Sequence, residues 1–322
     1  GVPISYYKSY SKGSPVVVIK KTATTAGEYL AQVKSLIGKR GTEQTVIRLC
    51  EQGQSLSPTI LQATNLFEYS GMTKFIISDN QEGLTDLNKA IEISPRKSSL
   101  YDLRGSMRTL EEDYQGAIVD FNTAIEIDPK RASAYINRGE TKNRLNDNQG
   151  ADADYTKAIQ VSREGSYYLA HRYTRRGMLR YKKLMDYQGA LSDFNRALES
   201  KRKDTMIVYH PRGSVKLQLG DYKGAISDLN KAVEWGESEK VRPRQLHEAY
   251  NNRGIAKGRL GDEKGAFNDY SMAIAINPEY AESYNNRGIS RSYLGDMQGA
   301  VNDYNQALIL DPRNSNAYRN RG

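Results

Sequence analysis

Aromatic, small and polar residues recur along this chain with a period of 34 positions. Gly254, Gly288 and Gly322 mark this even spacing, and each follows a Tyr-Xaa-Asn-Arg segment. A regular period of this length indicates an array of stacked structural repeats. Because each unit of such an array buries its apolar face on its neighbours, the chain needs no single central core.

The repeat covers residues 64–322. Its units start at residues 64, 98, 132, 170, 206, 247 and 281, and a truncated eighth unit starts at residue 315. Position 4 of every unit is aromatic, position 8 is glycine, position 24 is large, and positions 20 and 27 are alanine apart from Gly83. Small residues at positions 8, 20 and 27 allow two antiparallel helices to approach closely, while the larger side chains fill the space beside them.

Polar residues and glycines mark the expected helix ends. Aspartate occupies position 16 of the seven full units, from Asp79 to Asp296, where its carboxylate can cap the second helix. Gly220, Gly261 and Gly295 stand one residue earlier and suit the left-handed conformation that ends a first helix. Proline at position 32 of four units is predicted to stop the second helix.

This pattern resembles the tetratricopeptide repeat, a helix–turn–helix unit of about 34 residues. The match lies at positions 4, 8, 20, 24, 27 and 32 of each unit. The resemblance implies an all-α fold, a right-handed superhelical solenoid of antiparallel helix pairs. It also implies that the first helices line a concave groove, with positions 2, 5, 6, 9, 12 and 13 facing inward.

The implied groove would present mainly asparagine and basic side chains. Asparagines one repeat apart can donate to and accept from the backbone of an extended peptide, although they can equally be ordinary polar residues of a helix face. The family's grip on a C-terminal carboxylate needs a lysine at position 5 that is missing here, so we do not expect a receptor for chaperone tails. The candidate groove residues are Asn137, Arg144, Arg175, Lys182, Asn251, Asn252, Arg259, Asn285, Asn286, Tyr293 and Asn320.

Two further columns of the repeat are charged. Arginine occupies position 7 of the second to eighth units, and aspartate occupies position 23 of the first to seventh. The first unit has Asp86 but carries Ser70 in place of the arginine, and this offset predicts pairing between successive units, such as Asp86 with Arg104. The alternative is a line of free arginines for an acidic partner.

Residues 1–63 do not follow the repeat. The apolar run at 16–19 predicts a short strand, and apolar residues around Leu30 and Val33 and around Val46 and Cys50 predict two short helices. The Ser-Pro pair at 57–58 predicts the N-cap and first residue of a third helix. This region is interpreted as an irregular helical cap on the first repeat or, alternatively, as the tail of an upstream domain, for which residues 1–4 resemble the closing strand of trypsin-like proteases.

The period breaks between residues 166 and 246. Four residues are added at 166–169, one more near Met185, and a polar insertion separates Trp235 from His247. Pro211 falls at position 6 of its unit, so the helix there should start late or kink. This region is a hinge, a binding feature or simple sequence drift. Residues 166–205 also hold ten basic and four acidic side chains, which would attract carboxylates, phosphates or polyanions.

Composition narrows the class of protein. The chain has a net charge of +9, 23 tyrosines and a single cysteine, Cys50, so an intramolecular disulfide is excluded. No apolar run approaches the roughly 20 residues that a membrane helix needs. These features favour a soluble protein, with the cytoplasm as the favoured compartment, and most of the tyrosines are accounted for by repeat packing.

The sequence therefore predicts a protein-interaction scaffold that binds a protein or peptide in its groove, with an acidic partner among the candidates and with no cofactor. An enzyme is not expected, because the three histidines lack metal-ligand spacing and no phosphate-binding glycine loop occurs. Two alternatives stay open. One is an RNA- or polyanion-binding repeat that uses the basic 170–205 unit, although nucleic acid is not the favoured partner. The other is the interaction arm of a larger enzyme.

Overall fold

The computed structural model describes residues 23, 25–39, 41–56, 58–77, 79–163, 168–199, 207–239 and 243–321. Every regular element within these residues is a helix. They divide into two compact units, residues 1–164 and 165–322. The expected strand at residues 16–19 lies outside the described residues.

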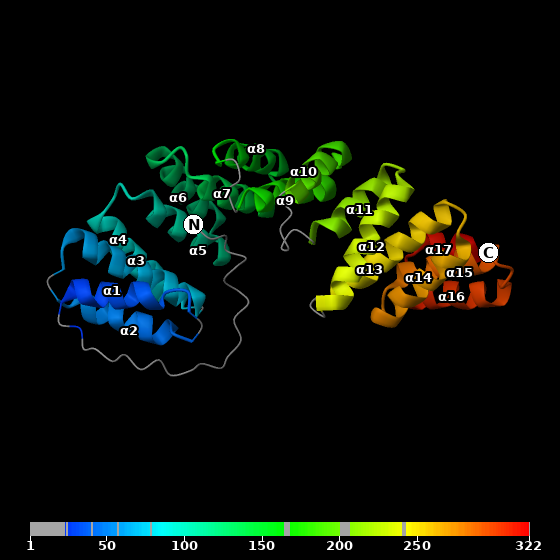
Figure 1. The fold of residues 1–322 in the computed structure, drawn as a ribbon, viewed down its shortest axis with the longest axis horizontal. Helices are drawn as coiled ribbons and strands as arrows, with labels where there is room; N and C mark the ends of the chain where they lie inside the picture. Colours follow the sequence, from blue (N-terminus) through cyan, green and yellow to red (C-terminus); the bar gives the residue numbers. More distant parts are fainter. Residues whose placement is uncertain are drawn as a thin grey trace. The chain divides into compact units, whose positions relative to one another are not determined.

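In the first unit, consecutive helices pack as antiparallel pairs joined by short connections (Figure 1). These helices are α1 (Ala26–Leu36), α2 (Glu43–Gln54), α3 (Ile60–Ile76), α4 (Asn80–Ile93), α5 (Ser98–Leu110), α6 (Tyr114–Ile127), α7 (Ala132–Arg144) and α8 (Asn148–Gln160).

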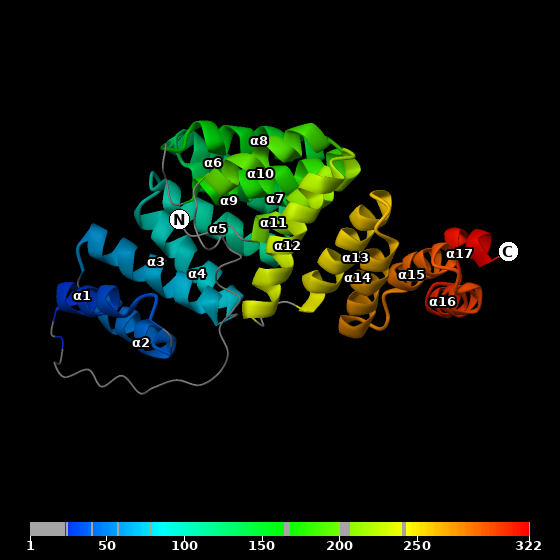
Figure 2. The ribbon, with the colours of Figure 1, turned by 45° about the vertical axis from the view of Figure 1, so that its right-hand side comes forward.

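The second unit continues the same pairing (Figure 2), and the all-α solenoid of antiparallel helix pairs is confirmed. Its helices are α9 (Leu169–Leu179), the π-helical turn η2 (Arg180–Leu184), α10 (Tyr187–Glu199), α11 (Tyr209–Gln218), α12 (Tyr222–Glu239), α13 (Pro243–Arg259), α14 (Glu263–Ile276), α15 (Ala281–Tyr293), α16 (Met297–Leu310) and α17 (Ser315–Arg321).

The two short helices expected before the repeats are present as α1 and α2. Their buried side chains, Val33 and Cys50 among them, form one apolar cluster with Leu66 of α3. The expected start of α3 at residues 57–58 is wrong, because the helix begins at Ile60 with Thr59 as its N-cap. Thr59 and Gln62 bond each other's backbone N–H groups, and this capping box fixes the start two residues later than the Ser-Pro pair suggested.

Glycine at position 8 is where the two helices of a repeat approach most closely. A Cβ atom on Gly105 would lie 2.8 Å from the Phe121 ring, and one on Gly254 would lie 2.7 Å from the Tyr270 ring. These separations are too short for any side chain at position 8. The aromatic ring at position 24 therefore packs directly on the backbone of the first helix.

Aspartate caps the second helix in six of the seven full repeats, as expected. Asp147, for example, accepts a hydrogen bond of 2.9 Å from the N–H of Gly150, three residues later. A Cβ at Gly150 would lie only 2.1 Å from the Asp147 carboxylate, so another residue there would displace the carboxylate from its present position. The first repeat carries Glu82 at this position, and Asp79 makes no side-chain cap.

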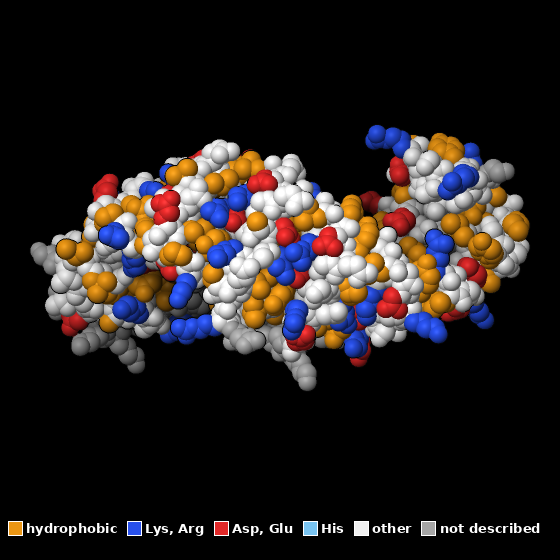
Figure 3. Space-filling view, turned by 90° about the horizontal axis from the view of Figure 1, so that it is seen from above, with side chains coloured by type: hydrophobic (Ala, Val, Ile, Leu, Met, Phe, Trp, Pro, Cys, Tyr) orange, Lys and Arg blue, Asp and Glu red, His pale blue; other side chains and the backbone are white. Residues whose placement is uncertain are grey.

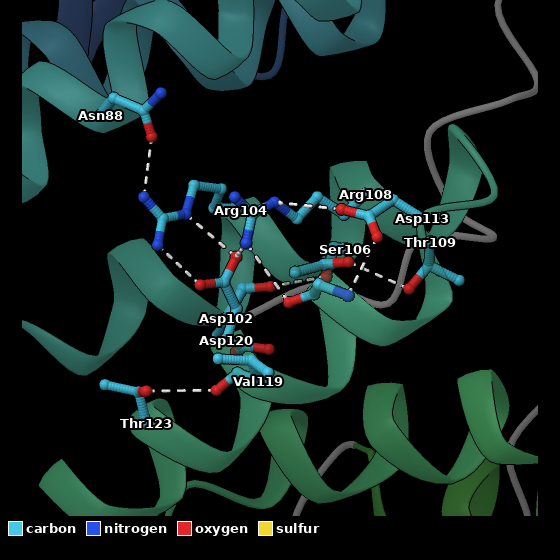
Figure 4. Close-up of polar contacts among 12 residues, drawn as sticks. Asn88, Asp102, Arg104, Ser106, Arg108, Thr109, Asp113, Val119, Asp120 and Thr123 are labelled. Atoms are coloured by element: carbon cyan, nitrogen blue, oxygen red, sulfur yellow. Dashed lines mark hydrogen bonds and ion pairs between the residues drawn. The ribbon is translucent and has the colours of Figure 1, made fainter.

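The expected pairing of aspartate and arginine between successive repeats is wrong, because each pair forms within one repeat. Arg104 donates from Nε and Nη2 to both oxygens of Asp120, at 2.9 and 2.7 Å, and not to Asp86 (Figure 4). The second helix folds back beside the first, and this places position 23 next to position 7 of the same unit. The same pairing joins Arg138 to Asp154, Arg176 to Asp193, Arg212 to Asp228, Arg253 to Asp269, and Arg287 to Asp303.

Asparagine links four of these arginines to the preceding repeat, and serine links Arg287. The Nη1 atom of Arg104 donates to Asn88 at 2.7 Å, and Arg138 reaches Asn122 in the same way, at 2.6 Å. The Arg104 guanidinium also lies 5.5 Å from the ring centre of Tyr101, at position 4 of the same helix. Since each guanidinium is held on several sides, the column is part of the packing and not a free line of charges.

A second basic column at position 11 completes the arrangement. Every full repeat has a lysine or arginine there, and each lies 2.8–3.3 Å from the position 23 aspartate. In the first repeat, Lys74 and Ser70 share Asp86 between them at 3.0 and 2.7 Å. Asp86 therefore has one basic partner and one hydroxyl donor, where the aspartates of the other full repeats have two basic partners.

Three irregularities between residues 166 and 246 can be placed within the described helices. The extra residue near Met185 forms the π-helical turn η2, and Met185 then adopts a left-handed conformation with φ of 53°. Helix α11 begins only at Tyr209, which places Pro211 in its first turn, as expected from the missing N–H of proline. The polar insertion lengthens α12 and α13 to 18 and 17 residues.

Candidate binding groove

The first helices of the second unit line a pocket of about 410 Å³. Its walls come from α9, η2, α11, α13 and α15, together with Ile207 and Tyr280. Apart from Tyr280, every lining residue occupies position 2, 5, 6, 9, 12 or 13 of its repeat. These are the positions that the repeat resemblance places on the inner face.

Apolar and aromatic side chains form much of the pocket wall. Met178, Ile207 and Pro211 contribute aliphatic surface, while Tyr181 and Tyr280 contribute rings. Burial raises the pKa of the Tyr181 hydroxyl, and the nearby carboxylates of Glu248 and Glu282 raise it further. Tyr181 is therefore a neutral hydroxyl donor at physiological pH.

Histidine and carboxylate side chains provide the polar part. The Nε2 atom of His210 is buried, has no hydrogen-bond partner among the described residues, and lies 3.9 Å from Glu248 Oε2. Burial lowers the pKa of His210 to about 4, and the positive charge of Lys182 and the nearby His247 act in the same direction. The imidazole is therefore neutral near pH 7.

Glu282 is held in place at the far wall by two side chains. The Tyr280 hydroxyl donates to its Oε2 atom at 2.6 Å, and Asn251 Nδ2 approaches Oε1 at 3.5 Å. The Tyr280 ring also contacts His247 edge to face, with ring centres 4.8 Å apart. This carboxylate is thus fixed by neutral donors and not by a basic side chain.

Most of the candidate asparagines bond one another between successive repeats. Asn286 donates to Asn251 at 3.2 Å, and Asn320 donates to Asn285 at 3.1 Å. Asn137 is buried and donates to Asp102 and Ser106 of the preceding repeat, at 2.9 and 3.1 Å. Part of their hydrogen-bonding capacity is therefore used within the stack.

The other candidates are scattered. Arg144, Arg259 and Tyr293 are exposed near the ends of α7, α13 and α15, and Arg175 donates to His171 at 3.2 Å. Among all the candidates, the structure brings only Lys182 and Asn252 together in the pocket, where Asn252 donates to Ser214 at 3.0 Å.

The sequence-based choice missed several pocket residues, namely Tyr181, His210, Glu248, Tyr280 and Glu282. Glu248 and Glu282 both occupy position 2, an inward position from which no candidate was taken. Tyr280 lies in the connection before α15, where the repeat pattern gives no inward position. A search of all inward positions for residues that differ from repeat to repeat would have found all but Tyr280.

In the described part of the basic 170–205 segment, several arginines are paired with acidic side chains. Arg176 and Arg180 both bind Asp193, at 2.6 and 3.2 Å, and Arg196 lies 3.2 Å from Glu199. On the face shown in Figure 3, basic and acidic side chains of the described residues are interspersed. Lys201, Arg202 and Lys203 lie outside the described residues.

The described part of the chain holds no group of three or more histidine, cysteine, aspartate or glutamate side chains placed to bind a metal ion. None of the described helices combines the length and apolar character that crossing a bilayer requires.

Comparison with known proteins agrees with the fold. A family model, Tetratricopeptide repeat, matches residues 132–164, 208–237 and 281–314. No curated protein matches the sequence significantly.

Several solved structures are similar to the chain. One is YrrB, described as a TPR protein with an unusual peptide-binding site; it is 24% identical with a TM-score of 0.51, over 62% of this chain and 96% of that chain. PilF of Pseudomonas aeruginosa is 17% identical with a TM-score of 0.56, over 69% and 96%. Tom70 of yeast is 16% identical with a TM-score of 0.52, over 98% and 66%.

At these identities the structural likenesses speak for the fold alone. They agree with the family model and with the period of the sequence repeat. The chain is a tetratricopeptide repeat protein.

Proposed function

We propose that this protein is an interaction scaffold that holds an extended segment of a partner protein along the first helices of residues 165–322. The observation that carries the proposal is the pocket of about 410 Å³, which is lined by inward positions of successive repeats. Its volume lies within the range of about 300–1,000 Å³ typical of ligand pockets. YrrB, of the same fold, is described as having a peptide-binding site.

Within the proposal, the two regions of the chain have different tasks. Residues 64–322 form the repeat array, and residues 1–63 cover the end of the first repeat through α1 and α2. In support, Leu66 of α3 is completely buried in a cluster formed with α1 and α2. Stacked repeats need such end coverings, because their terminal apolar faces would otherwise meet water.

A direct test uses a displayed library of random peptides selected on the full chain. The variant Gln218→Trp would fill the pocket from an exposed position 13, and Gln188→Trp makes the same change at an exposed position of the second helix α10, outside the pocket. We expect selected peptides to lose at least about tenfold in affinity with Gln218→Trp, equal to about 1.4 kcal/mol, and to keep most of it with Gln188→Trp.

The proposal fails if the library yields no specific peptide, or if the two tryptophan variants weaken binding equally. Thermal unfolding of both variants, followed by circular dichroism, checks that neither change unfolds the array.

A further inference from the structure

Carboxylates in the pocket differ from the buried aspartates at position 23 by having no basic partner. Each of those aspartates binds one or two cations, and Asp228, for example, binds Arg212 and Lys216 at 2.6 and 2.9 Å. Glu248 and Glu282 form no ion pair with any lysine or arginine among the described residues. Two carboxylates therefore face the same pocket with their charge uncompensated.

The only basic side chain of the pocket wall, among the described residues, is Lys182. It is exposed in η2 and pairs with neither glutamate. Two carboxylates against one ammonium group leave the wall with an excess of negative charge. A carboxylate brought into this pocket by a ligand would be repelled by the glutamates, whereas a cation would be attracted.

The remaining polar atoms of the pocket also suit a hydrogen-bond donor. The Nε2 atom of His210 is buried without a partner, and a neutral imidazole can accept one hydrogen bond. A guanidinium group carries five N–H donors and no acceptor, so it can satisfy several such acceptors at once.

The apolar wall suits the rest of an arginine side chain. Met178, Ile207 and Pro211 can cover the aliphatic stem, while the rings of Tyr181 and Tyr280 offer faces for a guanidinium plane. A lysine would gain the same charge attraction but offers fewer donors and no planar group.

We propose that the pocket binds a basic side chain of the partner segment, with arginine preferred over lysine. This inference rests on the proposed function, because it assumes that a peptide occupies the pocket. It replaces the acidic partner suggested by the arginine column and by the basic residues at 166–205 with a basic one, on the basis of the local charge of the pocket.

The test measures binding of capped heptapeptides to the full chain by isothermal titration calorimetry. Six positions are alanine, and the central residue is arginine, lysine, citrulline, leucine or glutamate. Citrulline keeps the shape of arginine but is neutral. We expect the arginine peptide to bind roughly tenfold tighter than the citrulline peptide, as a charge-assisted hydrogen bond would give, with lysine between them and glutamate weakest.

Matched variants test whether the preference for arginine over citrulline arises in the pocket. Glu248→Gln should reduce the preference for arginine over citrulline roughly tenfold. Glu279→Gln makes the same charge change at an exposed residue next to Tyr280 that does not line the pocket, and should leave the preference unchanged. Lys182→Gln should leave arginine binding intact or strengthen it.

The outcomes separate the two proposals. If the leucine or glutamate peptide binds as tightly as the arginine peptide and Gln218→Trp abolishes that binding, the groove binds peptides but the basic preference is wrong. If none of the heptapeptides binds, and the displayed library also yields no peptide, both proposals are wrong. Equal effects of Glu248→Gln and Glu279→Gln would assign the preference to general charge and overturn the pocket assignment.

Discussion

Arg104 in α5 holds Asp120 in α6 of the same repeat through two parallel hydrogen bonds, and Arg108, one turn further along α5, donates to the same carboxylate at 2.9 Å. Asp120 is almost completely buried, so its carboxylate depends on these donors. The arrangement ties the two helices of the repeat together by charge as well as by packing.

Replacing Asp120 with alanine should therefore destabilise the first unit strongly. Two partly buried guanidinium groups would lose their carboxylate, and breaking a buried ion pair from one side costs about 3–5 kcal/mol. Urea unfolding followed by circular dichroism measures the change. Glu126→Ala on the exposed face of α6 serves as the control and should cost under about 0.5 kcal/mol. Similar losses for both variants would contradict the role given to Asp120.

The cap of α8 predicts that the effect of Gly150→Ala on the free energy of unfolding changes sign when Asp147 is also replaced. Gly150→Ala places a Cβ 2.1 Å from the Asp147 carboxylate, so in the natural sequence it should displace the cap and cost about 1 kcal/mol. In an Asp147→Ala background the clash is absent, and alanine should stabilise the helix by up to about 1 kcal/mol over glycine. Thermal unfolding of the four proteins tests this, and the same sign in both backgrounds would refute the clash.

The turn between α5 and α6 predicts a stabilising substitution. Glu112 has a φ of 64°, in the left-handed region where Gly220, Gly261 and Gly295 occupy the equivalent turns of later repeats. Glu112→Gly should therefore stabilise the chain by about 0.5–1 kcal/mol, since glycine has no steric cost there. Glu111, with a φ of −82°, is the control, and Glu111→Gly should give no gain in the melting temperature.

The pocket histidine predicts a pH dependence of stability. Burial lowers the pKa of His210 from its ordinary value of 6.5 to about 4 in the folded chain, and the positive charge of Lys182 and the nearby His247 lower it further. The Oε2 atom of Glu248 lies 3.9 Å from His210 Nε2. Between these pH values the unfolded chain binds the proton and the folded chain does not. The contribution of His210 to the free energy of unfolding is therefore fully present above about pH 6.5, and up to about 3 kcal/mol of it is lost as the pH falls toward 4.

Comparison with His210→Gln isolates this contribution, because glutamine does not titrate and all other groups are shared. The difference in free energy of unfolding between the two proteins should change with pH between 7.5 and 4. A constant difference over that range would show that His210 titrates alike in the folded and unfolded chains.

Much of the fold could be predicted from the sequence because it depends on contacts inside a single repeat. Gly105 beneath Phe121 and Asp147 capping α8 are visible as fixed columns, and each needs only the two helices of one unit. The late start of α11 followed in the same way from the backbone chemistry of Pro211.

Contacts that involve the choice of a neighbour were predicted wrongly or missed. Two charged columns that recur once in every unit are compatible with pairing inside a unit or across units. Ser70, which replaces the arginine of the first unit, favoured pairing across units. The column at position 11, with Lys74 as its first member, was the signal that would have decided between them. The pocket was missed for a related reason, since His210, Glu248 and Glu282 come from three different repeats and none of them belongs to a column.

The π-helical turn Arg180–Leu184 has a consequence for how such chains change in length. Arg176 and Asp193 are separated by 17 residues in place of the usual 16, yet their hydrogen bonds of 2.9 and 2.6 Å match those of Arg253 and Asp269. The extra residue is accommodated within one π-helical turn, and the hydrogen bonds between the two helices keep their usual lengths. A hairpin built in this way can gain or lose a residue in evolution without unpairing its helices, and the repeats can drift in length while their contacts stay the same.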